Sequence, residues 1–254
     1  MLRKRLQLGL IHVAVAMTLV PINSTLNRVM IKELGIAATI VAILAILPYL
    51  FAPLQVAIGS FSDRHPILGF RRSPYILLGL ILCVAGVIVS PQVAFLMAEQ
   101  PALGYLVAAL AFGAWGMGYN LSAVSYLSLA TELSGENGRG KTIATMWFMM
   151  IVSIIFTAIA ISRLVEPYSP EALQTAFWEV GLAALGLGLL GLVRLESRHQ
   201  VAGSGGENYS FREMAAVIVK SRQATTFFWY LTLLLAAILG QDVLLEPFAA
   251  EAFG

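Results

Sequence analysis

Charged residues are scarce in this chain. Only 12% of its 254 residues are Asp, Glu, Lys or Arg, whereas 59% are hydrophobic and the mean hydropathy is +0.83. A soluble globular domain carries about 25% charged residues, so the composition excludes an ordinary soluble fold and indicates a membrane protein. The net charge of +2 is too small to indicate a nucleic-acid partner.

Cysteine and catalytic motifs are equally scarce. The single cysteine, Cys83, lies inside an apolar run, so no intramolecular disulfide is possible. The sequence contains no HExxH zinc motif, no glycine-rich phosphate loop and no Ser/His/Asp set. We therefore expect neither enzymatic activity nor a metal site built by the protein alone.

Long apolar runs are abundant. Each is about 20 residues long, enough for a helix rising 1.5 Å per residue to cross a hydrocarbon core of about 30 Å. They predict an all-α, polytopic membrane bundle: six helices over 1–194, a cytoplasmic linker with a short amphipathic helix over 195–222, and a seventh helix within 223–254. The seven runs cover residues 6–26, 37–58, 74–93, 102–125, 142–162, 174–193 and 224–245.

The basic residues predict the orientation. Thirteen of the sixteen Lys and Arg residues lie in segments expected on the same side of the membrane as the N-terminus. Because cytoplasmic loops carry the excess of Lys and Arg, we expect a cytoplasmic N-terminus.

Proline and serine mark the helix ends and one interruption. Pro48 and Pro53 lie inside the second run, where they should kink the helix and free backbone carbonyls. Such a break lines the pathway in transporters and only curves the helix in other membrane proteins, and both readings stay open. Ser73 and Ser169 each precede a proline and are expected N-terminal caps of the third and sixth helices.

Polar residues inside the spans are the candidate ligands. At the periodicity of an α-helix, His12, Asn23 and Asn27 fall on one face of the first helix. They could offer an imidazole and two amide oxygens to a ligand or metal, or form a hydrogen-bond network between helices. In the fourth helix Trp115 and Tyr119 belong to an aromatic stripe that either packs the bundle or forms a wall for a ring-shaped ligand.

Two carboxylates stand out in the seventh helix. Asp242 and Glu246 are four residues apart, on one face, just before Pro247. Inside a membrane this pair would handle protons or cations; if the helix ends near residue 245, Glu246 only reaches the interface.

The segment GSFSDRHPILGFRR, residues 59–72, resembles the loop between the second and third helices of the major facilitator superfamily, with residues 65–68 inserted. That resemblance implies a charge network with an acid at the end of the fourth helix, and an Asp63 that pairs within its own half of the fold. The expected network comprises Asp63, Arg64, Arg71, Arg72, Glu132 and Arg139.

Three stretches narrow the resemblance. They are similar to the bacteriochlorophyll delivery branch of that superfamily, the PucC-type light-harvesting assembly proteins and their cyanobacterial relatives. Family members have about twelve helices, so the resemblance implies a chain that lacks the last five, either as a fragment or as a half-size relative bound in a photosynthetic complex. The stretches are TLNRVMIKELG (25–35), LPYLFAPLQVAIGSFSDRHPILGFRRSPYI (47–76) and QDVLLEPFAAEAFG (241–254).

The resemblance implies a multi-pass protein of a cyanobacterial thylakoid or bacterial inner membrane. It would bind or deliver chlorophyll or bacteriochlorophyll, with carotenoid and lipid as further candidate ligands. Its partners would be subunits of a photosynthetic pigment–protein complex, and the missing second half or another membrane subunit. From the residues themselves, His12 or Gln55 could ligate the chlorophyll magnesium.

Two alternatives remain open from the sequence. One is a proton-coupled secondary transporter of a small solute, with Asp242 and Glu246 as coupling groups. The other is a purely structural membrane subunit.

Overall fold

The structure is a computed structural model, and it describes residues 1–51, 54–198, 222–223, 225–227, 229–230 and 233–234. The chain divides into two units, Met1–Val201 and Ala202–Gly254, which are described separately. In the first unit every long element is a helix. Five of the described helices are long and apolar enough to cross a membrane. The prediction of an all-α membrane protein is therefore confirmed for the described part of the chain.

Five of the seven apolar runs correspond to these spans. The first span begins with α1 (Leu2–Met17) and continues through two π-helical turns, η1 (Pro21–Leu26) and η2 (Val29–Glu33). The others are α4 (Ser73–Glu99), α5 (Pro101–Ser134), α6 (Arg139–Val165), preceded by the 3₁₀ turn η3 (Glu136–Gly138), and α7 (Pro170–Leu192).

The second run differs from the expectation of one spanning helix over 37–58. It forms two shorter helices, α2 (Ala38–Leu50), which ends at the turn residue Phe51, and α3 (Leu54–Arg64). Pro48 lies inside α2, and α2 ends two residues later at Leu50, with Phe51 in a turn. A proline inside a helix removes a backbone hydrogen bond and weakens the helix around it, and the second run is accordingly divided.

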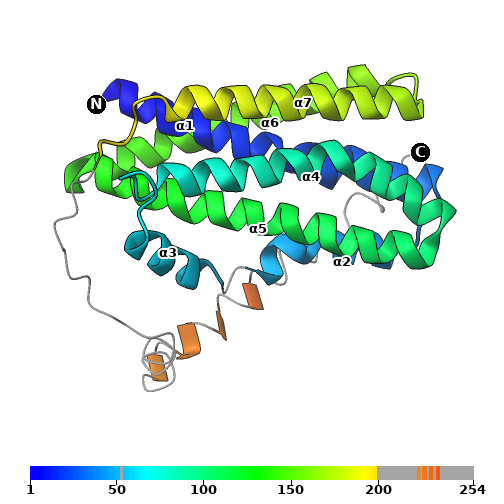
Figure 1. Cartoon of the computed structure of the whole chain (residues 1–254), viewed down its shortest axis with the longest axis horizontal. Coiled ribbons are helices and arrows are strands. Elements are labelled where there is room, and N and C mark those ends of the chain that lie inside the picture. The colour runs from blue at the N-terminus through cyan, green and yellow to red at the C-terminus, as the bar shows by residue number, and fades with distance from the viewer. Residues whose placement is uncertain (52–53, 199–221, 224, 228, 231–232, 235–254) are drawn as a thin grey trace. The chain divides into compact units, whose positions relative to one another are not determined.

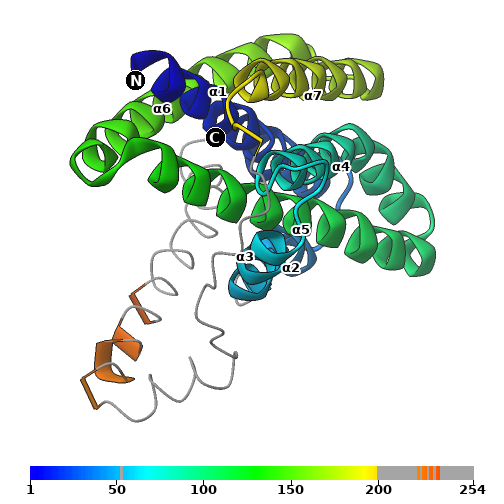
Figure 2. The ribbon, with the colours of Figure 1, turned by 60° about the vertical axis from the view of Figure 1, so that its left-hand side comes forward.

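Two groups of helices build the first unit around α5. On one side α4 packs along α5, and α1 lies against α5, α6 and α7; on the other side α2 and α3 cover α5 (Figures 1 and 2). The α4–α5 contact is close because Gly79 and Gly118 face each other: a Cβ added to Gly79 would lie 2.5 Å from the Gly118 carbonyl oxygen. Small residues permit such backbone approach in membrane bundles.

The outer faces of the spans are apolar. On α6 the side chains of Trp147, Phe148 and Phe156 are more than half exposed. Large apolar side chains on the outside of a bundle are what hydrocarbon solvent favours.

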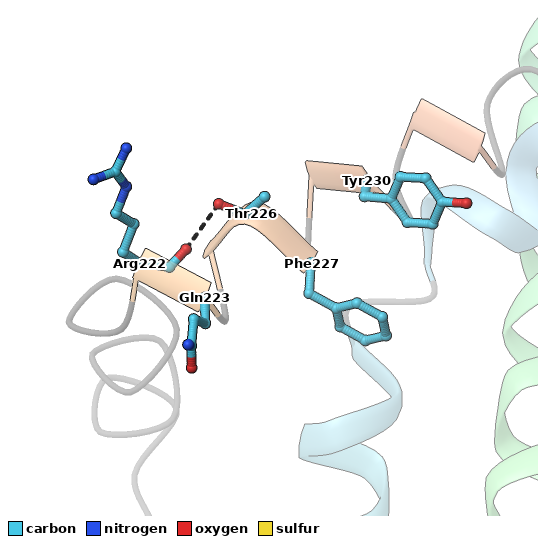
Figure 3. A pocket seen from close by; sticks show the side chains of 5 residues that line it. All are labelled: Arg222, Gln223, Thr226, Phe227 and Tyr230. Atoms are coloured by element: carbon cyan, nitrogen blue, oxygen red, sulfur yellow. Dashed lines mark hydrogen bonds between the residues drawn. The ribbon is translucent and has the colours of Figure 1, made fainter.

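Most of the predicted linker and seventh helix lies outside the described residues. In the second unit, residues 222–223, 225–227, 229–230 and 233–234 are helical. Arg222, Gln223, Thr226, Phe227 and Tyr230 line a shallow hollow there, in which the Thr226 hydroxyl donates to the Arg222 carbonyl at 2.9 Å (Figure 3).

Candidate functional site

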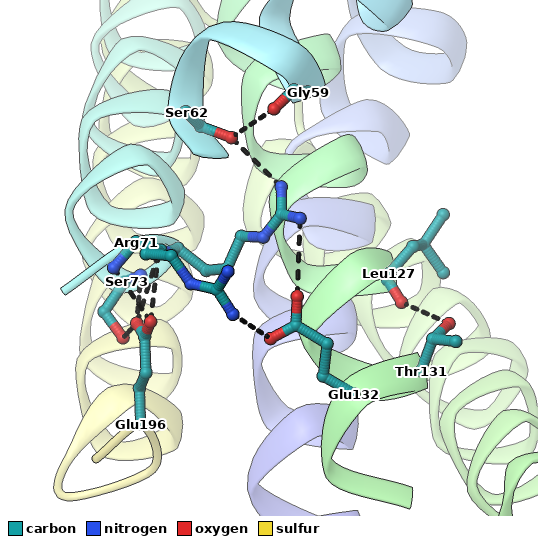
Figure 4. A network of polar contacts seen from close by, with 9 residues as sticks. Gly59, Ser62, Arg71, Ser73, Leu127, Thr131, Glu132 and Glu196 are labelled. Atoms are coloured by element: carbon teal, nitrogen blue, oxygen red, sulfur yellow. Dashed lines mark hydrogen bonds and ion pairs between the residues drawn. The ribbon is translucent and has the colours of Figure 1, made fainter. Parts of the chain in front are cut away.

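A charge cluster joins the end of α5 to the start of α4. The Glu132 carboxylate lies 3.4 Å from the Arg71 guanidinium and 3.5 Å from that of Arg72 (Figure 4). Arg72 is only 5% exposed, and burying an arginine is costly unless it is paired and hydrogen-bonded. The structure thus brings together three of the six residues expected in the charge network.

The same cluster reaches the end of α3. The Arg72 guanidinium donates to the Ser62 hydroxyl at 3.0 Å, and that hydroxyl donates to the Gly59 carbonyl at 2.9 Å (Figure 4). Arg72 therefore ties α3 to α5 through its side chain while its own backbone begins α4.

The other three expected members take no described part in the cluster. Arg64 ends α3 and Arg139 begins α6, and both are exposed without an ion pair to any described residue. The backbone of Asp63 lies in α3, but its side chain is outside the described part of the chain. Its predicted pairing within this half of the fold stays a prediction.

Glu196 is a member that the sequence reasoning missed. Its carboxylate accepts hydrogen bonds from the backbone N–H of Arg71 (2.9 Å), of Arg72 (3.2 Å) and of Ser73 (2.7 Å), and from the Ser73 hydroxyl (2.7 Å) (Figure 4). A carboxylate here satisfies unpaired N–H groups and opposes the positive end of the helix dipole.

Glu196 changes the role expected for Ser73. The predicted serine cap of α4 is wrong, because α4 has no side-chain cap from its own N-terminal residues and the Ser73 hydroxyl donates to Glu196 instead. At α7 the prediction is confirmed: the Ser169 hydroxyl accepts from the Ala172 N–H at 3.0 Å. The only sequence signal for Glu196 was an acid just past an apolar run.

The last two inserted residues, Ile67 and Leu68, take part in a tight turn. Ile67 and Phe70 exchange two backbone hydrogen bonds, of 2.9 and 3.0 Å. Leu68 and Gly69 between them both have positive φ, as in the two-residue turns that join twisted strands. Residues 67–70, which include the last two inserted residues, therefore form a small hairpin directly before Arg71.

A second polar group surrounds the break between α2 and α3. Asn120, fully buried on α5, donates to the Pro48 carbonyl at 2.7 Å and to the Gly116 carbonyl at 2.8 Å. The Asn120 side-chain oxygen accepts a hydrogen bond from the Gln55 side-chain amide on α3. Asn120 thus satisfies a carbonyl near the interruption and holds both helices on α5.

His12 lies at a different place in the bundle. Its ring is buried between Tyr126 of α5 and Trp147 of α6, with ring centroids 5.3 and 5.5 Å away. The His12 Nδ1 atom is buried and has no hydrogen-bond partner. His12 is therefore held by aromatic contacts and by no described hydrogen bond.

Asn23 and Asn27 follow in the π-helical part of the first span. The Asn27 amide donates to the Asn23 carbonyl at 3.0 Å, and the side-chain oxygens of both residues are buried without a partner. The single face expected for these asparagines and His12 assumed an α-helical period, which does not hold through π-helical turns. Single π-helical turns are frequent at functional sites.

The aromatic stripe of α5 divides into two environments. Trp115 is 1% exposed and packs edge-to-face on Phe112, with ring centroids 6.2 Å apart, so it belongs to the core. Tyr119 is half-buried beside that core.

The predicted carboxylates Asp242 and Glu246 lie outside the described residues. Within the described part of the chain, no three His, Cys, Asp or Glu side chains gather as metal ligands.

These features define a class: a multi-pass α-helical membrane protein with a charge cluster at one end and a broken second helix. A match to a protein family narrows this class further. The PUCC protein family matches residues 25–254, and the chain belongs to this family, which is related to the major facilitator superfamily. The family is linked to light-harvesting complex assembly, and its members are generally non-enzymatic assembly or transport proteins.

Curated relatives are similar to this chain over most of its length. Protein PucC of Rhodovulum sulfidophilum is 31% identical over 262 residues, covering 98% of this chain and 58% of the relative. Protein PucC of Cereibacter sphaeroides is 36% identical over 207 residues, covering 78% of this chain and 45% of the relative. The "Bacteriochlorophyll synthase 44.5 kDa chain" of Rhodobacter capsulatus is 28% identical over 248 residues, covering 98% and 57%.

The chain spans about half the length of the curated relatives it matches. No solved structure matches it.

Proposed function

We propose that this protein binds chlorophyll or bacteriochlorophyll within the membrane and assists the assembly of a photosynthetic pigment–protein complex. The observation that carries the proposal is membership of the PUCC family over residues 25–254. One similar relative is named for bacteriochlorophyll synthesis. Subunits of that complex are the proposed partners, and carotenoid and lipid are secondary ligands.

The polar atoms of the spans are compatible with this function. A chlorophyll magnesium takes an axial ligand, and oxygen donors suit magnesium. Gln55 carries an amide oxygen on α3, beside the span α5, and His12 carries an imidazole between two aromatic rings. Bound pigment would supply light absorption, while the protein would hold and orient it.

The direct test is the colour of the purified protein. The full chain, expressed in a pigment-producing host and purified in mild detergent, should show the red absorption band of a chlorophyll and yield extractable pigment. An unrelated multi-pass protein purified from the same host controls for adventitious pigment. Pigment no greater than in that control would refute the proposal.

Deletion distinguishes assembly from passive membership of a complex. Loss of the protein should block accumulation of the pigment–protein complex, whereas loss of a structural subunit would only reduce the absorption of a finished complex.

A colourless preparation that moves a solute into liposomes would instead favour a coupled transporter, with Asp242 and Glu246 as the coupling pair.

A further inference from the structure

The amide groups at the break between α2 and α3 form a fixed chain. Asn120 uses its side-chain N–H groups on the carbonyls of Pro48 and Gly116, so its own oxygen must face the Gln55 amide nitrogen. A Cβ added to Gly116 would lie 2.9 Å from the Pro48 backbone, which shows how closely α2 and α5 approach here. The orientation of the Gln55 amide is therefore set by a buried, closely packed partner.

The remaining oxygen of Gln55 is left as an open acceptor. Its Oε1 atom accepts no hydrogen bond from any described residue, and it is not among the buried unpaired atoms. Gln55 itself is only half-buried. The amide therefore presents an oriented oxygen at the edge of the bundle.

Gln55 belongs to α3, which packs against the membrane span α5. A polar acceptor in apolar surroundings is costly without a partner, so an open, oriented oxygen on this helix favours a ligand that uses it.

We infer that Gln55 Oε1 is the axial ligand of the magnesium of a chlorophyll-type pigment, and that Asn120 is the residue that positions it. The inference rests on the proposed function and names the ligating atom. Magnesium is a hard cation that favours oxygen donors. Tyr49, 43% exposed, and Phe51, beside Gly113, flank the break and offer apolar surface for a flat ring.

His12 is the weaker of the two candidate ligands. A histidine that binds a metal almost always donates its second ring N–H to a carboxylate, carbonyl or water. The His12 Nδ1 atom is buried without any such partner, and its ring already packs against Tyr126 and Trp147. Gln55 has the supporting hydrogen bond that His12 lacks.

Variants of Gln55 in the full chain test the inference, with pigment per protein and band position as readouts. Gln55→Met keeps length and removes the oxygen, and pigment should fall about tenfold or more, the loss expected when metal ligation is disturbed. Gln55→His supplies a nitrogen ligand, so it should restore pigment with a displaced absorption band. Gln92→Met, the same change at an exposed glutamine of α4, is the matched control and should keep pigment and band unchanged.

Asn120→Leu tests the positioning role. It should shift and broaden the band of the pigment that remains, because the ligand is still present but no longer oriented. An unshifted band in Asn120→Leu would overturn the positioning role.

The outcomes separate this inference from the proposed function. Full pigment in a well-folded Gln55→Met overturns the ligand assignment and leaves pigment binding standing. If Gln55→Met fails to fold, an undisplaced band in Gln55→His overturns it instead. A colourless unaltered protein overturns both.

Discussion

Replacing Glu196 by alanine should weaken the fold at the end of the bundle where α4 begins. The substitution removes the acceptor of three backbone N–H groups and of the Ser73 hydroxyl. It also removes the hydrogen bonds that link the chain leaving α7 to the Arg71–Arg72 segment, which pairs with Glu132. The arginines would keep their ion pairs but lose the anchor of their backbone.

The contacts give the size of the effect. A hydrogen bond to a charged group contributes about 1.5–3 kcal/mol, and a negative charge at a helix N-terminus adds about 0.3–1 kcal/mol. Glu196 is half-buried, so water replaces part of what is lost. We expect the free energy of unfolding to fall by about 2–4 kcal/mol for Glu196→Ala and by about 1–2 kcal/mol for Glu196→Gln, which keeps one acceptor oxygen.

The measurement is a denaturant titration of the purified protein in mixed detergent micelles, followed by helical circular dichroism. Glu136→Ala is the matched control, because Glu136 is exposed in the turn before α6 and makes no hydrogen bond or ion pair with a described residue. It should change stability by less than about 0.5 kcal/mol. A Glu196→Ala variant as stable as this control would refute the capping argument.

Four further substitutions can be measured by the same titration. Glu132→Gln should cost only about 0.5–1 kcal/mol, because the Glu132 side chain is 39% exposed; a loss above 3 kcal/mol would contradict this. Gly79→Ala should cost about 1–3 kcal/mol by overpacking against α5, whereas Gly186→Ala, which meets nothing within 4 Å, should stabilise by about 0.5–1 kcal/mol; equal effects would disprove the close contact. Asn120→Leu should cost about 1–3 kcal/mol by leaving the Pro48 carbonyl unpaired, and an unchanged stability would show that this hydrogen bond is dispensable.

The spans were predictable because hydrocarbon imposes a local rule. Each spanning helix must satisfy its own backbone and expose apolar side chains over about 20 residues, so α4 to α7 can be read from the sequence alone. The pairing of Arg71 and Arg72 with Glu132 could be anticipated only through a resemblance to a known loop. The stretches that suggested the PUCC family likewise needed only the order of residues.

The roles of single polar side chains depended on tertiary structure. The serine at the start of α4 looked like a cap, yet Glu196, more than 120 residues away, takes that role because the end of α7 lies beside it. Gln55 and Asn120 are 65 residues apart and meet only because Pro48 approaches Gly116 closely. Hydropathy fixed which segments lie in the membrane, whereas the partners of their few polar atoms depended on how the helices pack, since a hydrogen bond requires contact within about 3 Å.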